Sequence, residues 1–509
     1  MVESAGVFMF VAATAMAAAP QIFYLDLVSG PNSGGAHDLG VFVTVTGKNF
    51  GAQRGSSYIS IGSGTAGNYV FWSDTKIIFQ PGHNARTGAV IVTTPEGSSN
   101  SVYFSVRPGA IYFVDDTSEN NPGRGTYADP WRSPKSFYQV MKPGDTCYFR
   151  AGTYSEKYGE QNSNSNFNFG ENAPSGQPGN EIAFVAYPGE TVQLVANTKE
   201  VFTNIAFGYP KSHYVIAGFY MYATANCIGL NGDDNRIVNN KCEGLKTHSY
   251  SIINPVGGSG SKCYGNELFG ATSGDKLDHP LYIGYGTSNF DFGWNYIHNN
   301  DVAEGPLISI NEDNAGVNNT VFRNIQIHDN IIDCRYSSCP QRAVGIIATG
   351  KGSAVFVCNN IIIEPGGTAL YQYSGSGFYY RNTIYQAKGA AAISIAAVRD
   401  GKNDYRPETV EIRKNIIHVK DGCEYVKIDN GHLIGKLVIE QNCYYGNGKG
   451  PAADSEAVNK NPRFTDARLF DFRTIREVGD IGCDTSFIPK VGPENNLPEN
   501  AKKHDNVNK

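Results

Sequence analysis

A short motif recurs eight times between residues 240 and 442: an apolar stretch, an asparagine, and a second apolar stretch. The shared asparagines are Asn240, Asn266, Asn295, Asn330, Asn360, Asn382, Asn415 and Asn442, at intervals of 22 to 35 residues. A repeat of this length with uneven spacing is typical of a solenoid, whose coils share a fixed core and differ in their loops. No other feature of the chain constrains its fold as strongly.

Apolar and polar positions alternate around each asparagine. Three residues before it stand Ile237, Cys263, Phe292, Ile327, Val357, Tyr379, Ile412 and Ile439, and two residues after it stand Cys242, Leu268, Ile297, Ile332, Ile362, Ile384, Ile417 and Tyr444. This alternation has the period of a strand. We therefore predict two short strands on either side of a bend, with each asparagine amide bonded to backbone and to the equivalent amide one coil away. A β-sandwich with coincidental asparagines is the alternative.

The repeat resembles the right-handed parallel β-helix of the pectate-lyase-like superfamily. Residues 110–154 resemble the opening of many secreted β-helix proteins, with characteristic elements at Gly125–Trp131 and Pro143–Thr146. The stretch NPRFTDARLFDFRT and the VGDIG that follows it resemble the usual end of the last coil. The resemblance covers about residues 110–488. It implies a fold rather than a reaction, because this superfamily includes lyases, hydrolases, epimerases and proteins without enzymatic activity.

A separate unit precedes the repeat. Residues 20–107 contain alternating segments separated by glycine-rich turns, which predicts a small β-sandwich. The core Val43–Gly51 resembles the immunoglobulin-like IPT/TIG domain, and such domains serve as spacers, adhesive modules or accessories to secreted carbohydrate-active enzymes. Because neither an aromatic platform nor a metal cluster stands out here, we interpret this unit as a spacer.

Composition agrees with an all-β chain: 58 of 509 residues are glycine and 18% are charged. A net charge of −6 makes nucleic acid an improbable partner, and no apolar run after the N-terminus is long enough to span a membrane. The apolar leader predicts a signal peptide over residues 1–19, although it carries Glu3 and no basic residue. The predicted domains are thus the leader, the sandwich at 20–107, the β-helix at 110–488 and a polar tail at 489–509.

The ten cysteines form no zinc-binding pattern, so we predict no cofactor. Cys242 and Cys263 fall on inward columns and are expected to be buried free thiols. Cys334 and Cys339 bracket a short excursion that could be closed by a disulfide bond. Calcium held by Asp275 and Asp278 is conceivable, but no calcium-loop signature supports it.

If each asparagine marks the turn between the second and third strands of a coil, the first strand of the next coil follows. The candidates lie at 251–255, 280–285, 306–313, 344–349, 369–373, 392–396 and 425–429. In pectate-lyase-like enzymes the exposed face of this first sheet usually holds the polysaccharide. A linear groove suits a chain substrate, because coils repeat at about 4.8 Å.

Ionisable residues are densest between Asp275 and Arg323, a region that ends with the predicted VFRN strand. The longest interval between asparagines also falls there, which predicts loops at the rim of the groove. The candidate catalytic residues are His279, Lys276, Asp278, Arg323 and Tyr282. The candidate substrate-binding residues are Glu304, Asp275, Glu312, Arg342 and Tyr285.

A uronate lyase needs a cation to neutralise the carboxylate, a base to remove the α-proton and an acid to assist the leaving oxygen. Lys276 or His279 could be the base, Arg323 or Arg342 the neutralising cation, and Tyr282 or Tyr285 the acid. A glycoside hydrolase instead needs two carboxylates across the bond, and Asp275, Asp278, Glu304, Glu312 and Asp313 supply several pairs. His298, His328 and His418 lie in polar columns and are expected to be solvated surface histidines.

These observations predict a secreted or cell-surface protein that acts on an extracellular polysaccharide, with β-elimination of a uronate-containing glycan as the leading reaction. Glycoside hydrolysis on the same scaffold is the nearest alternative. A glycan-binding adhesin or surface structural protein shares every feature of the fold. The sugar, the linkage and the oligomeric state do not follow from the sequence.

Overall fold

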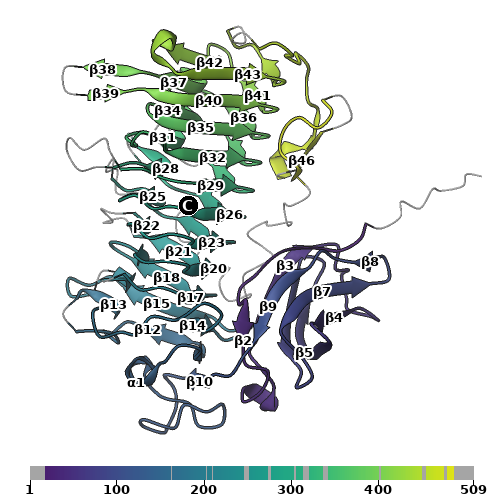
Figure 1. The fold of residues 1–509 in the computed structure, drawn as a ribbon, viewed down its shortest axis with the longest axis vertical. Helices are drawn as coiled ribbons and strands as arrows, with labels where there is room; N and C mark the ends of the chain where they lie inside the picture. The colour runs from purple at the N-terminus through teal and green to yellow at the C-terminus, as the bar shows by residue number, and fades with distance from the viewer. Residues whose placement is uncertain are drawn as a thin grey trace, which may run out of the picture.

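The computed structural model describes residues 18–161, 163–201, 203–208, 210–245, 251–272, 277–302, 305–312, 320–335, 342–400, 403–449, 454–469, 471–474 and 478–485. Most of the predicted leader and all of the predicted tail lie outside these residues. Two bodies make up the described chain, an antiparallel β-sandwich and a tall stack of parallel coils that stands beside it (Figure 1).

The sandwich is built from the first strands of the chain. They are β1 (Gln21–Leu25), β2 (Ser29–Gly30), β3 (Val43–Lys48), β4 (Tyr58–Ile61), β5 (Gly64–Trp72), β6 (Lys76–Pro81), β7 (Gly88–Thr94), β8 (Gly97–Ser98) and β9 (Val102–Val106), with a 3-10 turn at Ala36–Asp38. Strand β5 pairs with β6 along most of its length and with β4 at its start, so it joins the two layers. Alternate residues such as Val43, Val45 and Val90 are fully buried between the layers.

The coils form three parallel sheets, counted over the described residues. The 12-stranded sheet contains, in order, β10 (Ile111–Val114), β11 (Thr146–Phe149), β14 (Ile182–Ala186), β17 (Tyr214–Ala217), β20 (Arg236–Val238), β23 (Lys262–Tyr264), β26 (Asp291–Gly293), β29 (Ile325–His328), β32 (Ala354–Cys358), β35 (Gly375–Tyr380), β40 (Pro407–Arg413) and β43 (Lys436–Glu440). The 11-stranded sheet contains β12 (Gly152–Tyr154), β15 (Val192–Ala196), β18 (Tyr220–Ala223), β21 (Lys241–Gly244), β24 (Glu267–Phe269), β27 (Tyr296–His298), β30 (Ile331–Asp333), β33 (Ile361–Ile363), β36 (Thr383–Ala387), β41 (Ile416–Val419) and β44 (Cys443–Gly446).

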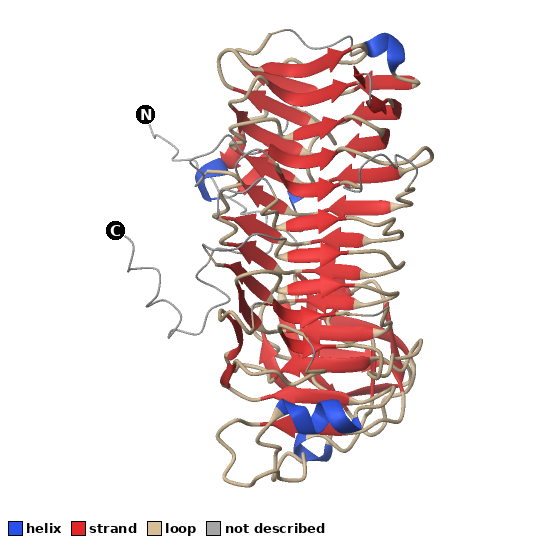
Figure 2. Ribbon diagram, turned by 90° about the vertical axis from the view of Figure 1, so that its left-hand side faces the viewer, coloured by secondary structure: helices blue, strands red, loops and turns tan. Residues whose placement is uncertain are grey.

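The 10-stranded sheet contains β13 (Ser165–Asn168), β16 (Thr203–Ala206), β19 (Ile228–Leu230), β22 (Ile253–Pro255), β25 (Leu281–Ile283), β28 (Pro306–Ile310), β31 (Arg342–Ile346), β34 (Leu370–Gln372), β37 (Ala391–Ala396) and β42 (Glu424–Asp429). A complete coil contributes one strand to each sheet, so the strands lie above one another along the stack (Figure 2). At the two ends, β10 and the pair of β43 and β44 belong to incomplete coils. The predicted right-handed parallel β-helix after an immunoglobulin-like sandwich is confirmed, and the β-sandwich alternative for the repeat is excluded.

A ladder of asparagines runs through the stack at the bend between the 12-stranded and 11-stranded sheets. All eight predicted asparagines are at most 1% exposed. Each donates its backbone N–H and its side-chain N–H to the amide oxygen of the next, as Asn330 does to Asn360 at 3.0 and 2.9 Å. The last, Asn442, donates its side-chain N–H instead to Asp454 Oδ2 at 2.8 Å. Every amide of this ladder is thereby paired, which fixes the register of the coils.

Both predicted apolar columns point into the stack. Their side chains belong to one continuous core, and Cys242 and Cys263 in these columns are fully buried free thiols, as predicted. Cys334 is also a buried free thiol, whereas Cys339 lies outside the described residues. Helix α1 (Pro134–Val140) covers the first coil, where Phe137 packs on Phe184 with ring centroids 5.0 Å apart.

The outer faces of two sheets are covered by other parts of the chain. The sandwich packs on the outer face of the 12-stranded sheet, where its core is continuous with Tyr148, Val185 and Val215. A hairpin of β45 (Phe464–Asp466) and β46 (Asp471–Thr474) packs on the 11-stranded sheet through Phe464 and Phe472. A second hairpin, β38 (Val398–Asp400) and β39 (Asn403–Tyr405), projects beside the last coils (Figure 1).

Candidate functional site

The strands predicted to follow each asparagine turn form the 10-stranded sheet. Their middle residues point outward, and pairing in register aligns them across the coils: Tyr282 lies beside Ser309, Ser309 beside Gly345, and Gly345 beside Tyr371. Because Ile253 pairs with Leu281, Asn254 takes the place next to Tyr282. We refer to Asn254, Tyr282, Ser309, Gly345 and Tyr371 as the outer row.

His279 lies two residues before the first residue of β25, at the entrance to the outer row. It is 4% exposed, and its Nδ1 lies 2.6 Å from the backbone oxygen of Pro306. A carbonyl oxygen can only accept, so Nδ1 carries a proton and donates it. The imidazole packs beside the Tyr282 ring, with centroids 5.7 Å apart. The preceding Asp278 is fully buried.

Arg342 occupies the position equivalent to His279 two coils further along, because Pro306 pairs with Arg342. Its guanidinium carbon lies 5.5 Å from the centre of the Tyr371 ring, a cation–π contact. The Tyr371 ring in turn lies over Gly345 of the preceding strand, β31, since a Cβ at Gly345 would come within 2.5 Å of the ring. Burial raises the pKa of Tyr371, so its hydroxyl stays protonated and Arg342 is a half-buried cation held on a neutral ring.

Two polar atoms of the outer row, and a third just past the end of β28, have no hydrogen-bond partner within the described part of the chain. They are Ser309 Oγ, Asn254 Oδ1 and Glu312 Oε2. Ser309 is only 1% exposed, and Glu312 follows β28 by two residues. A buried polar group without a partner costs about 1–3 kcal/mol, so several of them on one face are typical of a site that binds a polar ligand.

The remaining predicted residues are dispersed. Tyr285, at the far end of β25, is 56% exposed with a φ of 53°. Arg323 is exposed in the turn that leads into β29, so it belongs to the 12-stranded sheet and lies away from the outer row. Asp275, Lys276, Glu304 and the Asp313 named with them lie outside the described residues.

The structure thus brings together His279, Tyr282 and Arg342 among the predicted residues. It adds Asn254, Ser309 and Tyr371, which sequence reasoning missed. The available signal was the middle position of strands such as β28 and β34, because alternation sends this residue outward whenever its two neighbours are in the core. The three missed residues carry no charge at neutral pH, whereas the sequence search considered mainly ionisable residues.

The three histidines expected on the solvated surface are packed instead. His298 Nε2 lies 2.9 Å from Glu267 Oε1, and its ring stacks 4.2 Å from Tyr296. Phe269, which pairs with His298 from the neighbouring coil, stacks on the same imidazole with ring centroids 5.2 Å apart, so aromatic rings cover it. His418 likewise lies 4.6 Å from Tyr445, and burial, helped by Lys420, lowers its pKa to about 4.

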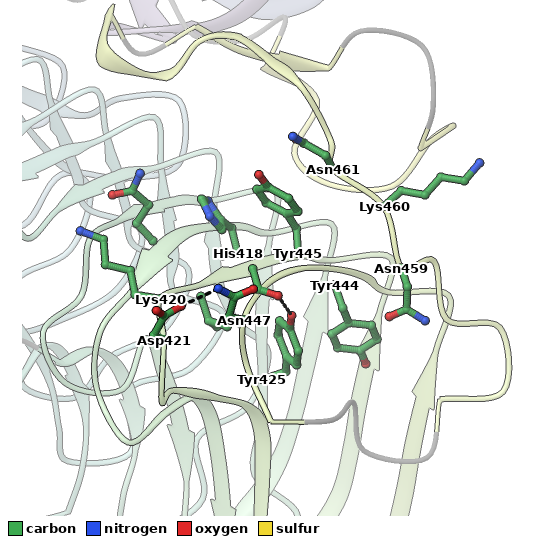
Figure 3. A pocket seen from close by; sticks show the side chains of 13 residues that line it. His418, Lys420, Asp421, Tyr425, Tyr444, Tyr445, Asn447, Asn459, Lys460 and Asn461 are labelled. Carbon is green, nitrogen blue, oxygen red and sulfur yellow. Dashed lines mark hydrogen bonds between the residues drawn. The ribbon is translucent and has the colours of Figure 1, made fainter.

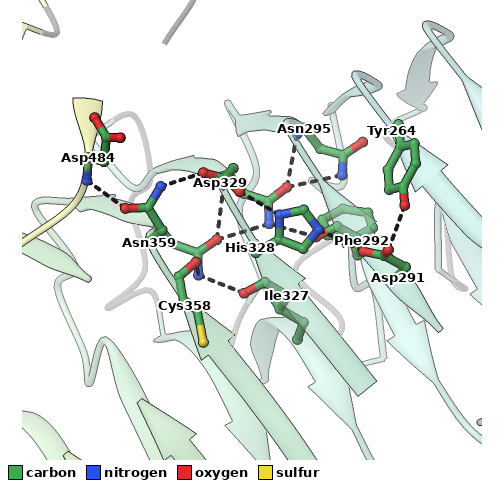
Figure 4. Close-up of polar contacts among 12 residues, drawn as sticks. Tyr264, Asp291, Phe292, Asn295, Ile327, His328, Asp329, Cys358, Asn359 and Asp484 are labelled. Atoms are coloured by element: carbon green, nitrogen blue, oxygen red, sulfur yellow. Dashed lines mark hydrogen bonds and ion pairs between the residues drawn. The ribbon is translucent and has the colours of Figure 1, made fainter. Parts of the chain in front are cut away.

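His328 is the last residue of β29, an inner strand of the 12-stranded sheet, and it lies between two carboxylates (Figure 4). Its Nε2 is 2.7 Å from Asp291 Oδ1 and its Nδ1 is 2.6 Å from Asp329 Oδ2. Burial alone would lower the pKa of His328, but the hydrogen bonds to both carboxylates outweigh burial and raise it to about 9. Burial alone would raise the pKa of Asp291, but the hydrogen bond from His328 and the charge of His328 outweigh burial and lower it.

Within the described ranges, no three His, Cys, Asp or Glu side chains gather closely enough to hold a metal ion. The helices that the structure describes include none with the length and apolar character of a membrane span.

The coil topology, the asparagine ladder and the sandwich define a two-domain chain with a parallel β-helix. The model of the IPT/TIG domain family matches residues 27–121, which identifies the sandwich. No curated protein matches the chain.

Solved structures similar to the chain include a rhamnogalacturonan lyase, with 14% identity over 77% of this chain and 98% of the other and a TM-score of 0.44. Pectate lyase Pel9A follows with 12% identity over 74% and 88% and a TM-score of 0.40. PfbA, a surface adhesin of Streptococcus pneumoniae, has 12% identity over 62% and 75% and a TM-score of 0.34. These likenesses concern the fold alone.

Proposed function

We propose that the protein is exported, acts on an extracellular polysaccharide, and binds it along the outer row of the 10-stranded sheet. The observation that carries this proposal is the combination of unpartnered polar atoms at Asn254 and Ser309 with a cation fixed at Arg342 on the same face. Sugar hydroxyls would pair with the polar atoms, and the cation would favour a glycan with carboxylates. Successive coils are about 4.8 Å apart, so an extended chain can contact one residue after another.

The reaction that fits these residues is β-elimination at a uronate. Arg342 is the candidate cation that neutralises the uronate carboxylate and so acidifies the α-proton next to it. It starts two coils from His279 and must leave the Tyr371 ring to reach the same uronate. His279 is the candidate base, because its Nδ1 already donates to Pro306 and its other ring nitrogen is the one that can take up a proton. Tyr282, in contact with His279, is the candidate acid that protonates the leaving oxygen.

Binding without cleavage is the second candidate, and the burial of the catalytic candidates favours it. His279 is 4% exposed and Asp278 is fully buried, so a substrate must displace covering atoms to reach them. Hydrolysis has less support among the described residues. Asp278 precedes β25 and Glu312 follows β28, so these carboxyl groups lie at opposite ends of neighbouring strands.

A panel of acidic and neutral polysaccharides, incubated with the full chain, tests these alternatives. Growth of ultraviolet absorbance from unsaturated uronates indicates a lyase, new reducing ends without that absorbance indicate a hydrolase, and retention without cleavage indicates a binding protein. We expect Arg342→Gln to lower the rate on an acidic glycan at least tenfold. The matched control is Arg473→Gln, because Arg473 is exposed and pairs with Asp471 on the C-terminal hairpin. Equal rates for the two variants would place the site elsewhere.

A further inference from the structure

An open cavity of about 890 Å³ lies on another side of the stack, near its C-terminal end. It is formed where β41 and β44 of the 11-stranded sheet end, beside β42 and residues 459–461 (Figure 3). Its volume falls in the range of about 300–1,000 Å³ that is typical of small-molecule sites. The outer row contributes no residue to it.

An aromatic ladder leads into this cavity. Tyr385, His418 and Tyr445 occupy equivalent outward positions on three successive coils. Their ring centroids are 5.2 Å apart for Tyr385 and His418 and 4.6 Å apart for His418 and Tyr445. Phe464 and Phe472 of the C-terminal hairpin cover Tyr385, at 5.7 and 5.3 Å. The other two rings of the ladder, those of His418 and Tyr445, line the cavity and are half-buried there.

Polar side chains line the cavity around these rings, and hydrogen bonds hold two of them in place. Asn447 donates to Asp421 Oδ1 at 2.8 Å, and the hydroxyl of the buried Tyr425 donates to the backbone oxygen of Gly446 at 2.8 Å. Asn459 and Asn461 are exposed and also line the cavity (Figure 3). The amides of Asn447, Asn459 and Asn461 therefore line the cavity together with the two rings. Because burial lowers the pKa of His418, its imidazole is uncharged at neutral pH.

We propose that this cavity is a second saccharide site, which binds one or two neutral sugar rings against Tyr445 and His418. A sugar presents an apolar C–H face and a rim of hydroxyls; the aromatic rings suit the face, and the amides of Asn447, Asn459 and Asn461 suit the rim. Two lysines and one aspartate at the rim leave little net charge to select an anion. The site would anchor a glycan independently of the outer row.

The test uses the full chain and ligand-observed NMR with xylose, galactose, rhamnose and cellobiose as probes. We expect at least one probe to bind, Tyr445→Ala to weaken that binding tenfold or more, and Tyr445→Phe to retain it within about threefold because the ring remains. Thermal melts of both variants check that the fold persists. The matched control is Tyr103→Ala, because Tyr103 is exposed on β9 of the sandwich, and it should leave this binding unchanged.

Two results would overturn the inference: binding of none of the probes, or binding that Tyr445→Ala leaves intact. If Arg342→Gln abolishes all saccharide binding while Tyr445→Ala has no effect, the outer row alone binds glycan. The second site is then wrong and the proposed function stands. If instead Tyr445→Ala abolishes saccharide binding and Arg342→Gln has no effect, the second site stands and binding along the outer row is wrong.

Discussion

The hydroxyl of Tyr24 donates a 2.8 Å hydrogen bond to Asn239 Oδ1, 215 residues further along the chain. Around this bond, Tyr24 and Trp294 pack with ring centroids 5.3 Å apart, and the Phe23 ring stacks on Trp294. Asn239 directly precedes the first asparagine of the ladder. The sandwich is therefore attached at the bend of the coils themselves, which adds a structural role to the spacer that the sequence suggested.

Arg236 provides the test of this attachment. It is 8% exposed and donates to the backbone oxygens of Leu25 and Asp26 across the domain boundary, at 2.5 and 3.2 Å. Arg236→Met leaves both oxygens without their charged donor. We expect the free energy of unfolding to fall by roughly 2–4 kcal/mol, measured by urea denaturation.

The control is Arg86→Met, because Arg86 is exposed and donates within its own loop of the sandwich. It should lower the free energy of unfolding by less than about 1 kcal/mol. Equal losses for the two variants would mean that the contact between the domains adds no stability.

The asparagine ladder should be the most sensitive polar feature of the coils. Asn360 donates to Asn382 Oδ1 from backbone and side chain and to the Ile327 oxygen at 2.8 Å, and it accepts from Asn330. Asn360→Ala leaves buried partners on both neighbouring coils unpaired. We expect a loss of roughly 2–4 kcal/mol in the free energy of unfolding, with a lower Tm in calorimetry.

Asn172→Ala is the matched control, since Asn172 is exposed on a loop before the repeat. It should change the free energy of unfolding by less than about 0.5 kcal/mol. A ladder variant as stable as this control would show that stacking of the apolar columns alone holds the coils in register.

Because His328 pairs with two carboxylates, we expect the free energy of unfolding to fall in mildly alkaline solution. Its folded pKa of about 9 lies above the ordinary value of 6.5, so its contribution is complete below pH 6.5 and is lost as pH rises through 9. The shift corresponds to at most about 3 kcal/mol. Urea denaturation at pH 6, 8 and 10 should give a steeper decline for the wild type than for His328→Gln. Parallel curves for the two proteins would contradict the carboxylate pairing.

The ladder itself was predictable, because a buried asparagine that recurs once per coil can satisfy its amide only through its equivalents. The backbone before it was not. The residue preceding each asparagine has a positive φ, including Trp294 at 57°, Arg381 at 53° and Lys414 at 54°. These residues have no intrinsic preference for that conformation, and the paired amide that follows imposes it.

Strands whose outer face is covered by another part of the chain differ in sequence from strands in which apolar and polar residues alternate. Strand β14 reads IAFVA and β17 reads YVIA, with every residue of both strands buried. A continuous apolar run predicts a strand covered on both sides, and the sandwich covers the outer side of these two strands.

The candidate site could not be predicted from the sequence for a different reason. His279 and Arg342 acquire their partners from a carbonyl and a ring on other coils, and sequence spacing does not reveal such contacts.

Ser309→Ala separates a binding role from a structural one on the outer row. Ser309 Oγ is buried and has no partner in the described part of the chain, so its removal should leave the free energy of unfolding unchanged or raise it by up to about 1 kcal/mol. Removal of a hydroxyl that bonds a sugar should weaken glycan binding about three- to tenfold, measured by calorimetry. Ser394→Ala is the control, because Ser394 points outward from the same sheet three coils further on and should alter neither quantity. A destabilised Ser309→Ala protein with unchanged glycan affinity would assign the hydroxyl to the fold and remove the main support for binding on this face.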